Sequence, residues 1–247
     1  MKYITTFNKP LYDTSGKDLL STLCKYNDID DIVVYTEGIS LTEFKTVNII
    51  KNGNIQQMLE RYPEKIPIYD GGTKKIVSGY ERRWFQWFRK MVMWCDYTNN
   101  HQPDSHEFIF LDCDIRQISH IHTHPELKGD INIMESTLIG AETGFIPCKC
   151  TPAAQLLFKT IINRFLSGEM FNYPRLDDSY IMSQMKQEYP EIIHDMATGI
   201  TPRHFKNSNG HKTSEQLLPF TQWGTYFEHD KGSHWRKKIV SKIDEKN

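Results

Sequence analysis

Apolar positions in the first 35 residues change from a strand pattern to a helix pattern and back. Residues 3–7 (YITTF) are rich in β-branched and aromatic side chains, which predicts a strand. A helix over about 15–27 is indicated by the helical spacing of Leu19, Leu20, Leu23 and Tyr26. Residues 32–35 (IVVY) form a continuous apolar run, typical of a strand buried on both faces. Strand, helix and strand form a βαβ unit, which predicts parallel strands.

The alternation of strands and helices continues along the chain. Residues 108–111 (FIFL) are the clearest strand, and helical spacing recurs over about 152–167 and 178–189. A helix over about 79–96 has a broad apolar face, made by Trp84, Trp87, Phe88, Met91, Val92 and Cys95. Residues 202–231 have few periodic apolar positions and are predicted to be loop. The pattern favours an α/β fold, a single Rossmann-like domain with a mixed, mainly parallel central sheet flanked by helices.

Length, composition and charge narrow the class of protein. The 247 residues are 38% hydrophobic, enough for one packed core, and no repeat or linker divides them, so we expect one domain over 1–247. The net charge of −1 gives no global attraction to nucleic acid or membrane. No window approaches the ~20 apolar residues of a membrane span, and no signal peptide is visible. We expect a soluble, cytoplasmic protein without a disulfide framework, since its five cysteines are an odd number.

Two aspartates, Asp112 and Asp114, directly follow the strand at 108–111. Ligands of open α/β sheets bind beyond the carboxyl ends of the strands. Two neighbouring carboxylates repel each other unless a cation lies between them. Hard oxygen ligands suit Mg²⁺ or Mn²⁺, which also bind substrate phosphates. The pair therefore predicts a divalent ion that bridges the protein and a diphosphate.

Two cations, Arg83 and Lys90, lie in line with Trp87 and Trp94 on the helix at 79–96. One interpretation is that their stems cover apolar surface while their charged ends stay in water. The other is that the charges emerge at a pocket that holds an anion.

These blocks, in this order, resemble small viral and bacterial nucleotide-sugar glycosyltransferases with the A-type fold. Residues 108–114 (FIFLDCD) are similar to the strand and DxD signature of that family. Residues 4–8 (ITTFN) and 33–38 (VVYTEG) resemble its nucleotide-binding opening. Residues 141–146 (AETGFI) and 176–180 (LDDSY) resemble two downstream blocks.

A C-terminal motif extends the resemblance. Residues 229–232 (HDKG) are similar to the His-x-x-Gly motif of glycogenin-like retaining transferases. This likeness implies that a C-terminal segment, about 202–247, folds back over the donor site. The glycogenin-like motif continues with a lysine where this chain has Trp235, so Arg236 or Lys231 would contact the phosphate instead.

The resemblance implies a metal-dependent hexosyl- or pentosyltransferase that uses a nucleoside-diphosphate-sugar, with UDP as the usual carrier and Mn²⁺ or Mg²⁺ as cofactor. It implies three metal ligands, Asp112, Asp114 and His229. The base and ribose would be bound by Thr6, Tyr12 and Glu37. The diphosphate or donor sugar would be contacted by Lys90, Asp112, Gly232 and Arg236. Asp178 would lie beside the sugar, and Glu142 and Thr143 close to the sugar or the acceptor.

The same assignment suggests roles in catalysis. Negative charge on the leaving diphosphate would be stabilised by the metal and by Lys90 or Arg236. The anomeric carbon becomes cationic, and Asp178 would stabilise it. If configuration is retained, which the His-x-x-Gly motif favours, the leaving phosphate helps to deprotonate the acceptor. If configuration is inverted, Asp178 or Glu142 would be the general base.

Three alternating histidines, His120, His122 and His124, form a competing constellation, because imidazoles are common zinc ligands. The His-Thr-His-Pro run among them resembles the JAMM-type metalloprotease signature. That signature has Ser and Asp where this chain has Asn132 and Glu135. The alternative functions are therefore a zinc-dependent hydrolase or a non-catalytic sugar-nucleotide binder. Otherwise the histidines lie in a partly exposed loop near the acceptor.

The acceptor is weakly specified. A glycan or small acceptor ranks first and a modified DNA base second, because DNA requires a basic surface. A local basic patch could form from Lys206, His211, Lys212, Arg236, Lys237 and Lys238.

Overall fold

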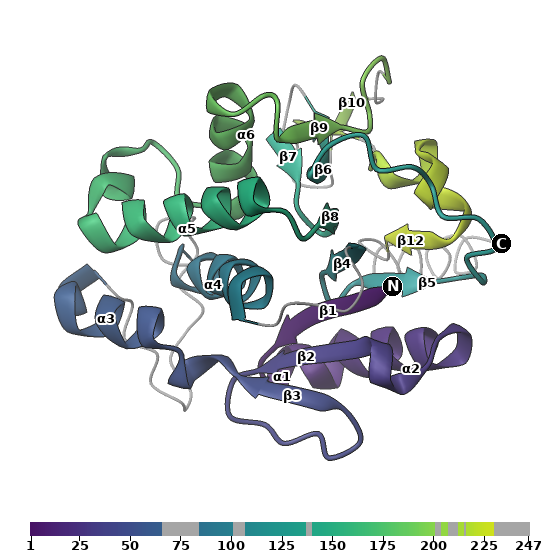
Figure 1. Cartoon of the computed structure of the whole chain (residues 1–247), viewed down its shortest axis with the longest axis horizontal. Helices are drawn as coiled ribbons and strands as arrows, with labels where there is room; N and C mark the ends of the chain where they lie inside the picture. The colour runs from purple at the N-terminus through teal and green to yellow at the C-terminus, as the bar shows by residue number, and fades with distance from the viewer. Residues whose placement is uncertain are drawn as a thin grey trace, which may run out of the picture.

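A central sheet of eight strands organises the fold (Figure 1). The computed structural model describes residues 1–65, 84–100, 107–136, 140–200, 204–206, 212–214 and 216–229. The strands are β1 (Lys2–Phe7), β2 (Ile32–Thr36), β3 (Lys45–Asn48), β4 (Glu107–Leu111), β6 (Ile131–Ser136), β7 (Gly140–Glu142), β8 (Phe145–Lys149) and β9 (Ile193–Asp195). Their order is β3-β2-β1-β4-β8-β6-β7, with β9 beside β6. β3, β2, β1 and β4 are parallel, whereas β8 is antiparallel to β4. The predicted α/β class with a mixed, mainly parallel sheet is confirmed.

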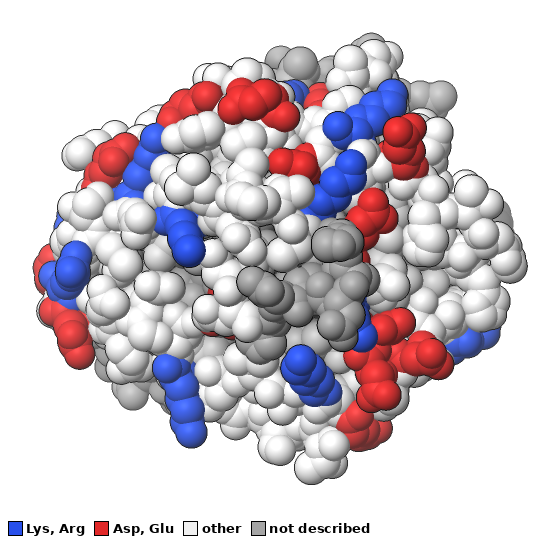
Figure 2. Space-filling view, viewed as in Figure 1, with Lys and Arg blue, Asp and Glu red and all other residues white. Residues whose placement is uncertain are grey.

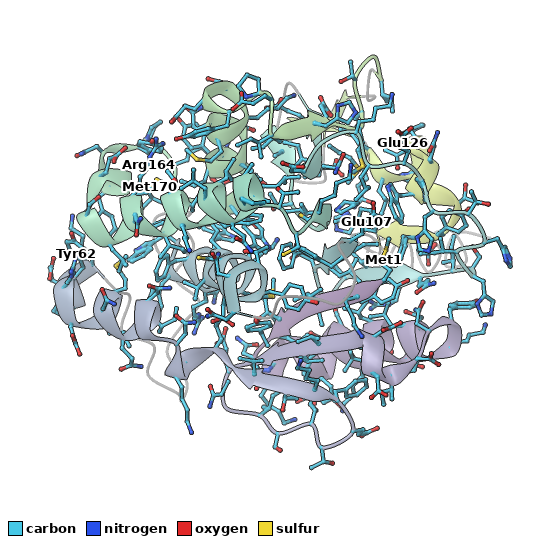
Figure 3. All side chains as sticks on the ribbon, in the orientation of Figure 1. Met1, Tyr62, Glu107, Glu126, Arg164 and Met170 are labelled. Atoms are coloured by element: carbon cyan, nitrogen blue, oxygen red, sulfur yellow. The ribbon has the colours of Figure 1, made fainter. Side chains whose placement is uncertain are left out.

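Helices cover the sheet and complete a layered structure (Figure 1). They are α1 (Lys9–Leu11), α2 (Lys17–Tyr26), α3 (Gly53–Arg61), α4 (Trp84–Asn100), α5 (Pro152–Ser167) and α6 (Asp178–Glu188). Strand alternation divides the core in two. Phe108 and Phe110 of β4 pack in the core with α3 to α6, whereas Ile109 and Leu111 pack in the core with α2. Figure 3 shows the side chains that fill these layers.

The long predicted elements are confirmed, and local chemistry explains their ends. The strands at 3–7, 32–35 and 108–111 match β1, β2 and β4. The helix expected over 15–27 is α2, preceded by a π-helical turn at Tyr12–Gly16. α5 begins after Thr151, whose side chain accepts a hydrogen bond from the Ala154 N–H, and it ends at Gly168 with φ of 84°. The first five residues of the helix expected over 79–96 lie outside the described residues.

The prediction that 202–231 is loop is wrong for three short strands. β10 (His204–Lys206) pairs with β11 (Lys212–Ser214), and β12 (Phe227–His229) pairs with β5 (Ile115–Gln117), both antiparallel. Strands of three residues are too short to show an alternating pattern, so periodicity does not predict them.

No helix in the described ranges is long and apolar enough to cross a membrane.

Candidate functional site

A tight turn places two aspartates beyond the carboxyl end of β4. The backbone N–H of Asp112 donates to the Gly144 carbonyl at 2.8 Å, which ties the turn to the start of β8. The Ile115 N–H donates to the Asp112 carbonyl at 3.1 Å and closes the turn. Asp112 and Asp114 therefore lie in one turn at the carboxyl end of β4, as the sequence predicts.

β12 brings His229 to this turn from the far end of the chain. In the β5–β12 pair, His229 lies opposite Ile115. Its Nε2 lies 3.2 Å from Oδ1 of Asp114, and its side chain is only 3% exposed. Nε2 is buried and has no hydrogen-bond partner among the described residues, so the short contact lacks hydrogen-bond geometry. The structure therefore brings together His229 and the two aspartates, all three predicted as metal ligands.

Gly144 lies next to the side chains of Asp112 and His229. A Cβ atom at this position would lie 3.3 Å from Oδ2 of Asp112 and 3.5 Å from Nε2 of His229. The absence of a side chain therefore lets the aspartate and the histidine converge on one space.

The chemistry of the three side chains fits a divalent cation. Two carboxylates and one imidazole are suitable ligands for Mn²⁺, and carboxylates alone suit Mg²⁺. A buried imidazole nitrogen without a hydrogen bond is costly unless a ligand satisfies it. Across the described ranges, no three His, Cys, Asp or Glu side chains are already gathered as a metal-binding group. Oδ1 of Asp112 points instead to Lys90, at 2.6 Å.

Lys90 lies at the centre of a buried charge network. Its Nζ is 2.6 Å from Oδ1 of Asp112 and 2.7 Å from Oδ2 of Asp178. The Thr143 hydroxyl donates to the same Asp178 oxygen at 2.7 Å. Burial lowers the pKa of Lys90, but the two carboxylates outweigh that effect and raise the pKa above its ordinary value. Lys90 is 8% exposed, and its ammonium lies 5.5 Å from the centre of the Trp94 ring. Its charge is therefore inside the protein and not in water.

Two of the residues expected to bind base and ribose, Thr6 and Glu37, lie at the carboxyl ends of neighbouring strands. In the sheet register, Thr6 lies opposite Tyr35 and Thr5 opposite Leu111. Thr6 at the end of β1, Glu37 after β2 and Asp112 after β4 therefore lie along one edge of the sheet.

Each donor-side residue has a distinct environment. The Thr6 hydroxyl oxygen is buried and has no hydrogen-bond partner among the described residues. The Tyr12 ring packs 5.5 Å from the Phe7 ring. Glu37 pairs with Nη1 of Arg89 at 2.7 Å. Burial raises the pKa of Glu37, and Arg89 opposes that shift.

Glu142 is held by the C-terminal segment. Both of its carboxylate oxygens accept from the Leu217 N–H, at 3.1 and 3.2 Å, and the residue is 7% exposed. Gly232 and Arg236, expected at the diphosphate, lie outside the described residues.

Three residues of the site are absent from the sequence-based prediction. They are Arg89, Gly144 and Arg116, the last of which donates to the Cys113 carbonyl in the acidic turn. Gly144 lies within the 141–146 block, and a glycine beside a strand is a signal for close approach of other groups. No sequence pattern marks Arg89 or Arg116 as a site residue, because single arginines are common in helices and strands.

The competing histidines are not arranged as a metal site. His120, His122 and His124 are exposed, and the first two rings lie 6.0 Å apart. The amide of Asn132 donates to the Gly129 and Pro147 carbonyls. Glu135 pairs with Lys186 at 2.6 Å. The residues that would complete a JAMM-type site are therefore engaged elsewhere.

No family model matches the chain, and its sequence matches no curated protein. Solved structures similar to it are glycosyltransferases. One acts in glycosylation of the major capsid of PBCV-1, with a TM-score of 0.48, 11% identity, and 94% and 96% of the two chains covered. Mouse xyloside xylosyltransferase 1 has a TM-score of 0.44, 13% identity and 78% and 84% coverage. Streptococcus pneumoniae GlyE has a TM-score of 0.43 and 10% identity over 78% of this chain, which spans 45% of GlyE.

Proposed function

We propose that the protein is a metal-dependent glycosyltransferase that moves a sugar from a nucleoside-diphosphate-sugar, UDP-sugar first, to an acceptor. The observation that carries the proposal is the convergence of His229 on the Asp112–Asp114 turn. These residues are far apart in the sequence, yet Nε2 of His229 lies 3.2 Å from Asp114 and faces the space beside Gly144. Acidic side chains and a buried imidazole at the end of a sheet strand suit a metal-bound diphosphate.

Asp112, Asp114 and His229 would hold Mn²⁺ or Mg²⁺. When bound, the ion would stabilise negative charge on the leaving diphosphate. Lys90 keeps Asp112 in one orientation, because its ammonium is shared between that carboxylate and Asp178. We therefore assign Lys90 mainly to positioning, and only secondarily to contact with the donor.

The donor would lie along the sheet edge that runs from β2 to β4. The unsatisfied Thr6 hydroxyl would bind the base or ribose, with Tyr12 and Glu37 beside it. The segment from about 202 to 247 would fold back over the donor, and the β5–β12 pair supports this, since it carries that segment to the acidic turn. Gly232 and Arg236 would then contact the diphosphate.

Asp178 would be the carboxylate beside the transferred sugar. It is buried and shares Lys90 with Asp112. Its negative charge would stabilise positive charge that develops at the anomeric carbon. Glu142 is the weaker candidate for a base, because the Leu217 N–H already occupies its carboxylate. We favour retention of configuration, in which no dedicated base is needed.

A glycan or small molecule is the favoured acceptor, with a modified DNA base second. On the face shown in Figure 2, the described Lys and Arg side chains are scattered among Asp and Glu. Those residues form no extended basic surface for DNA on this face. The side chains of the predicted basic patch, Lys206, His211, Lys212, Arg236, Lys237 and Lys238, lie outside the described part of the structure.

Thermal-shift measurements with UDP, GDP, ADP and CDP, each with Mn²⁺, with Zn²⁺ and with chelator, test the proposal. A ligand that binds only the native state raises its melting temperature. We expect one nucleoside diphosphate to stabilise the protein, only in the presence of Mn²⁺. Stabilisation by Zn²⁺ alone, without any nucleotide effect, would instead support a hydrolase that uses the histidine loop. Nucleotide binding that is indifferent to chelator would support a non-catalytic binder.

A further inference from the structure

Arg116 is a buried cation directly beneath the acidic turn, on β5. It is 8% exposed. Its Nη1 donates to the carbonyls of Cys113 and Ile115, both at 2.7 Å. Its Nη2 lies 3.6 Å from Oδ2 of Asp18 on α2. The guanidinium therefore binds the main chain on both sides of Asp114.

The bond to the Cys113 carbonyl controls the direction of Asp114. A peptide group is planar, so a hydrogen bond that fixes the Cys113 carbonyl also fixes the N–H of Asp114. Orientation of that plane sets where the Asp114 side chain leaves the turn. A charged donor makes this restraint stronger than a neutral one would.

The same strand also supports His229. Ile115, whose carbonyl Arg116 holds, is the residue opposite His229 in the β5–β12 pair. β5 is in turn anchored to α2, because the Asn27 amide donates to the Gln117 side chain at 2.6 Å. Arg116 thus contacts the turn that carries Asp114 and belongs to the strand that pairs with the strand of His229.

The positive charge of Arg116 also favours the arrangement of the two aspartates in one turn. Two carboxylates in one turn repel each other until a cation arrives. The Arg116 guanidinium, bonded to the Cys113 carbonyl between the two aspartates, brings a positive charge to the turn and so opposes that repulsion. The pair of Arg116 with Asp18, whose side chain is 72% exposed, is screened by solvent and contributes little.

We propose that Arg116 is a positioning residue that presets Asp114 and His229 for a divalent cation. The proposal rests on the metal-dependent function described above. It assigns to Arg116 no contact with the ion or the substrate. Residues that orient metal ligands typically change metal affinity about 10- to 100-fold when they are replaced.

Mn²⁺ binding, followed by the loss of the free-ion EPR signal, tests the assignment without any turnover. We expect Arg116→Met to weaken Mn²⁺ binding at least about tenfold, in the absence and presence of UDP. Arg116→Lys, which keeps the charge and one donor, should recover part of the loss. Asp18→Asn, which removes only the exposed counter-ion, should bind Mn²⁺ like the wild type.

Arg164→Met is the matched control for a merely structural role. Arg164 lies on α5, on the opposite side of the molecule from β5 (Figures 1 and 3), and pairs with Glu188. This variant should have a lower melting temperature than the wild type and the same Mn²⁺ affinity. If Arg116→Met also loses stability but binds Mn²⁺ within about twofold of the wild type, Arg116 is structural and the inference is wrong. If the wild type itself binds no Mn²⁺, the proposed function fails and the inference falls with it.

Discussion

At the scale of single residues, Lys90 joins two acidic side chains of the candidate site in the ligand-free protein. One ammonium group serves two carboxylates, Asp112 and Asp178, at 2.6 and 2.7 Å. Removal of one partner from such a buried group leaves charges without compensation. Lys90 is therefore important for folding as well as for activity.

We expect Lys90→Met to destabilise the protein by about 3–5 kcal/mol, because the buried Asp178 carboxylate and the partly buried Asp112 carboxylate lose their cation. Denaturant unfolding measures this change. Lys90→Met combined with Asp178→Asn should cost less than the two separate changes added together, since the residues are coupled. Lys159→Met, an exposed lysine on α5, is the control and should change stability by no more than about 0.5 kcal/mol. Additive effects in the double variant would contradict the network.

A substitution at Gly144 tests whether a metal ion binds between Asp112 and His229. The φ of Gly144 is not in the left-handed region, so alanine is compatible with the backbone. The added Cβ would lie 3.2 Å from Cε1 of His229 and 3.3 Å from Oδ2 of Asp112. We expect Gly144→Ala to weaken Mn²⁺ binding about tenfold, as measured by titration calorimetry.

Gly53→Ala is the matched control for that variant, because nothing lies within 4 Å of a Cβ at Gly53. It should leave Mn²⁺ affinity unchanged. An unchanged affinity in Gly144→Ala as well would show that the ion does not bind in this space.

At the scale of elements, β12 links the C-terminal segment to the site. Its anchor is Phe227, which is 1% exposed and packs 5.0 Å from the Phe145 ring and 6.3 Å from the Tyr3 ring. His229, two residues further along, faces the acidic turn. Anchoring and the proposed metal ligation therefore fall to different residues of one strand, Phe227 and His229.

This division predicts two different phenotypes. Phe227→Ala should destabilise the protein by about 3–5 kcal/mol, because a large buried ring is lost. His229→Ala should keep most of the stability and lose Mn²⁺-dependent stabilisation by the nucleoside diphosphate. Melting temperatures with and without Mn²⁺ and UDP separate the two. If His229→Ala keeps the nucleotide effect, β12 does not complete the donor site.

The elements also show what sequence patterns could predict. Four consecutive apolar residues before Asp112 predict β4, and the helical spacing over 152–167 predicts α5. β5 and β12 were not predicted, because each has three residues and their pairing depends on tertiary contacts. His229 is predicted at the site only by the resemblance of residues 229–232 to the glycogenin-like motif. No sequence pattern predicts β12, the strand that carries it.

At the scale of the whole molecule, the parallel sheet explains why the predicted donor residues share one edge. Thr6 lies near the end of β1, and Glu37 and Asp112 directly follow the neighbouring strands β2 and β4, as expected from the βαβ pattern that the sequence shows. The pairings of Arg89 with Glu37 and of Arg116 with the turn could not be predicted. Each joins segments that are distant in sequence or depends on the path of a tight turn.

Diffraction at the manganese absorption edge, from crystals grown with Mn²⁺ and UDP, tests the central claim most directly. The account predicts an anomalous peak within coordination distance of Asp114 and His229, beside Gly144, that is absent in Asp114→Asn crystals. A peak at His120, His122 and His124, or none at the acidic turn, would contradict it.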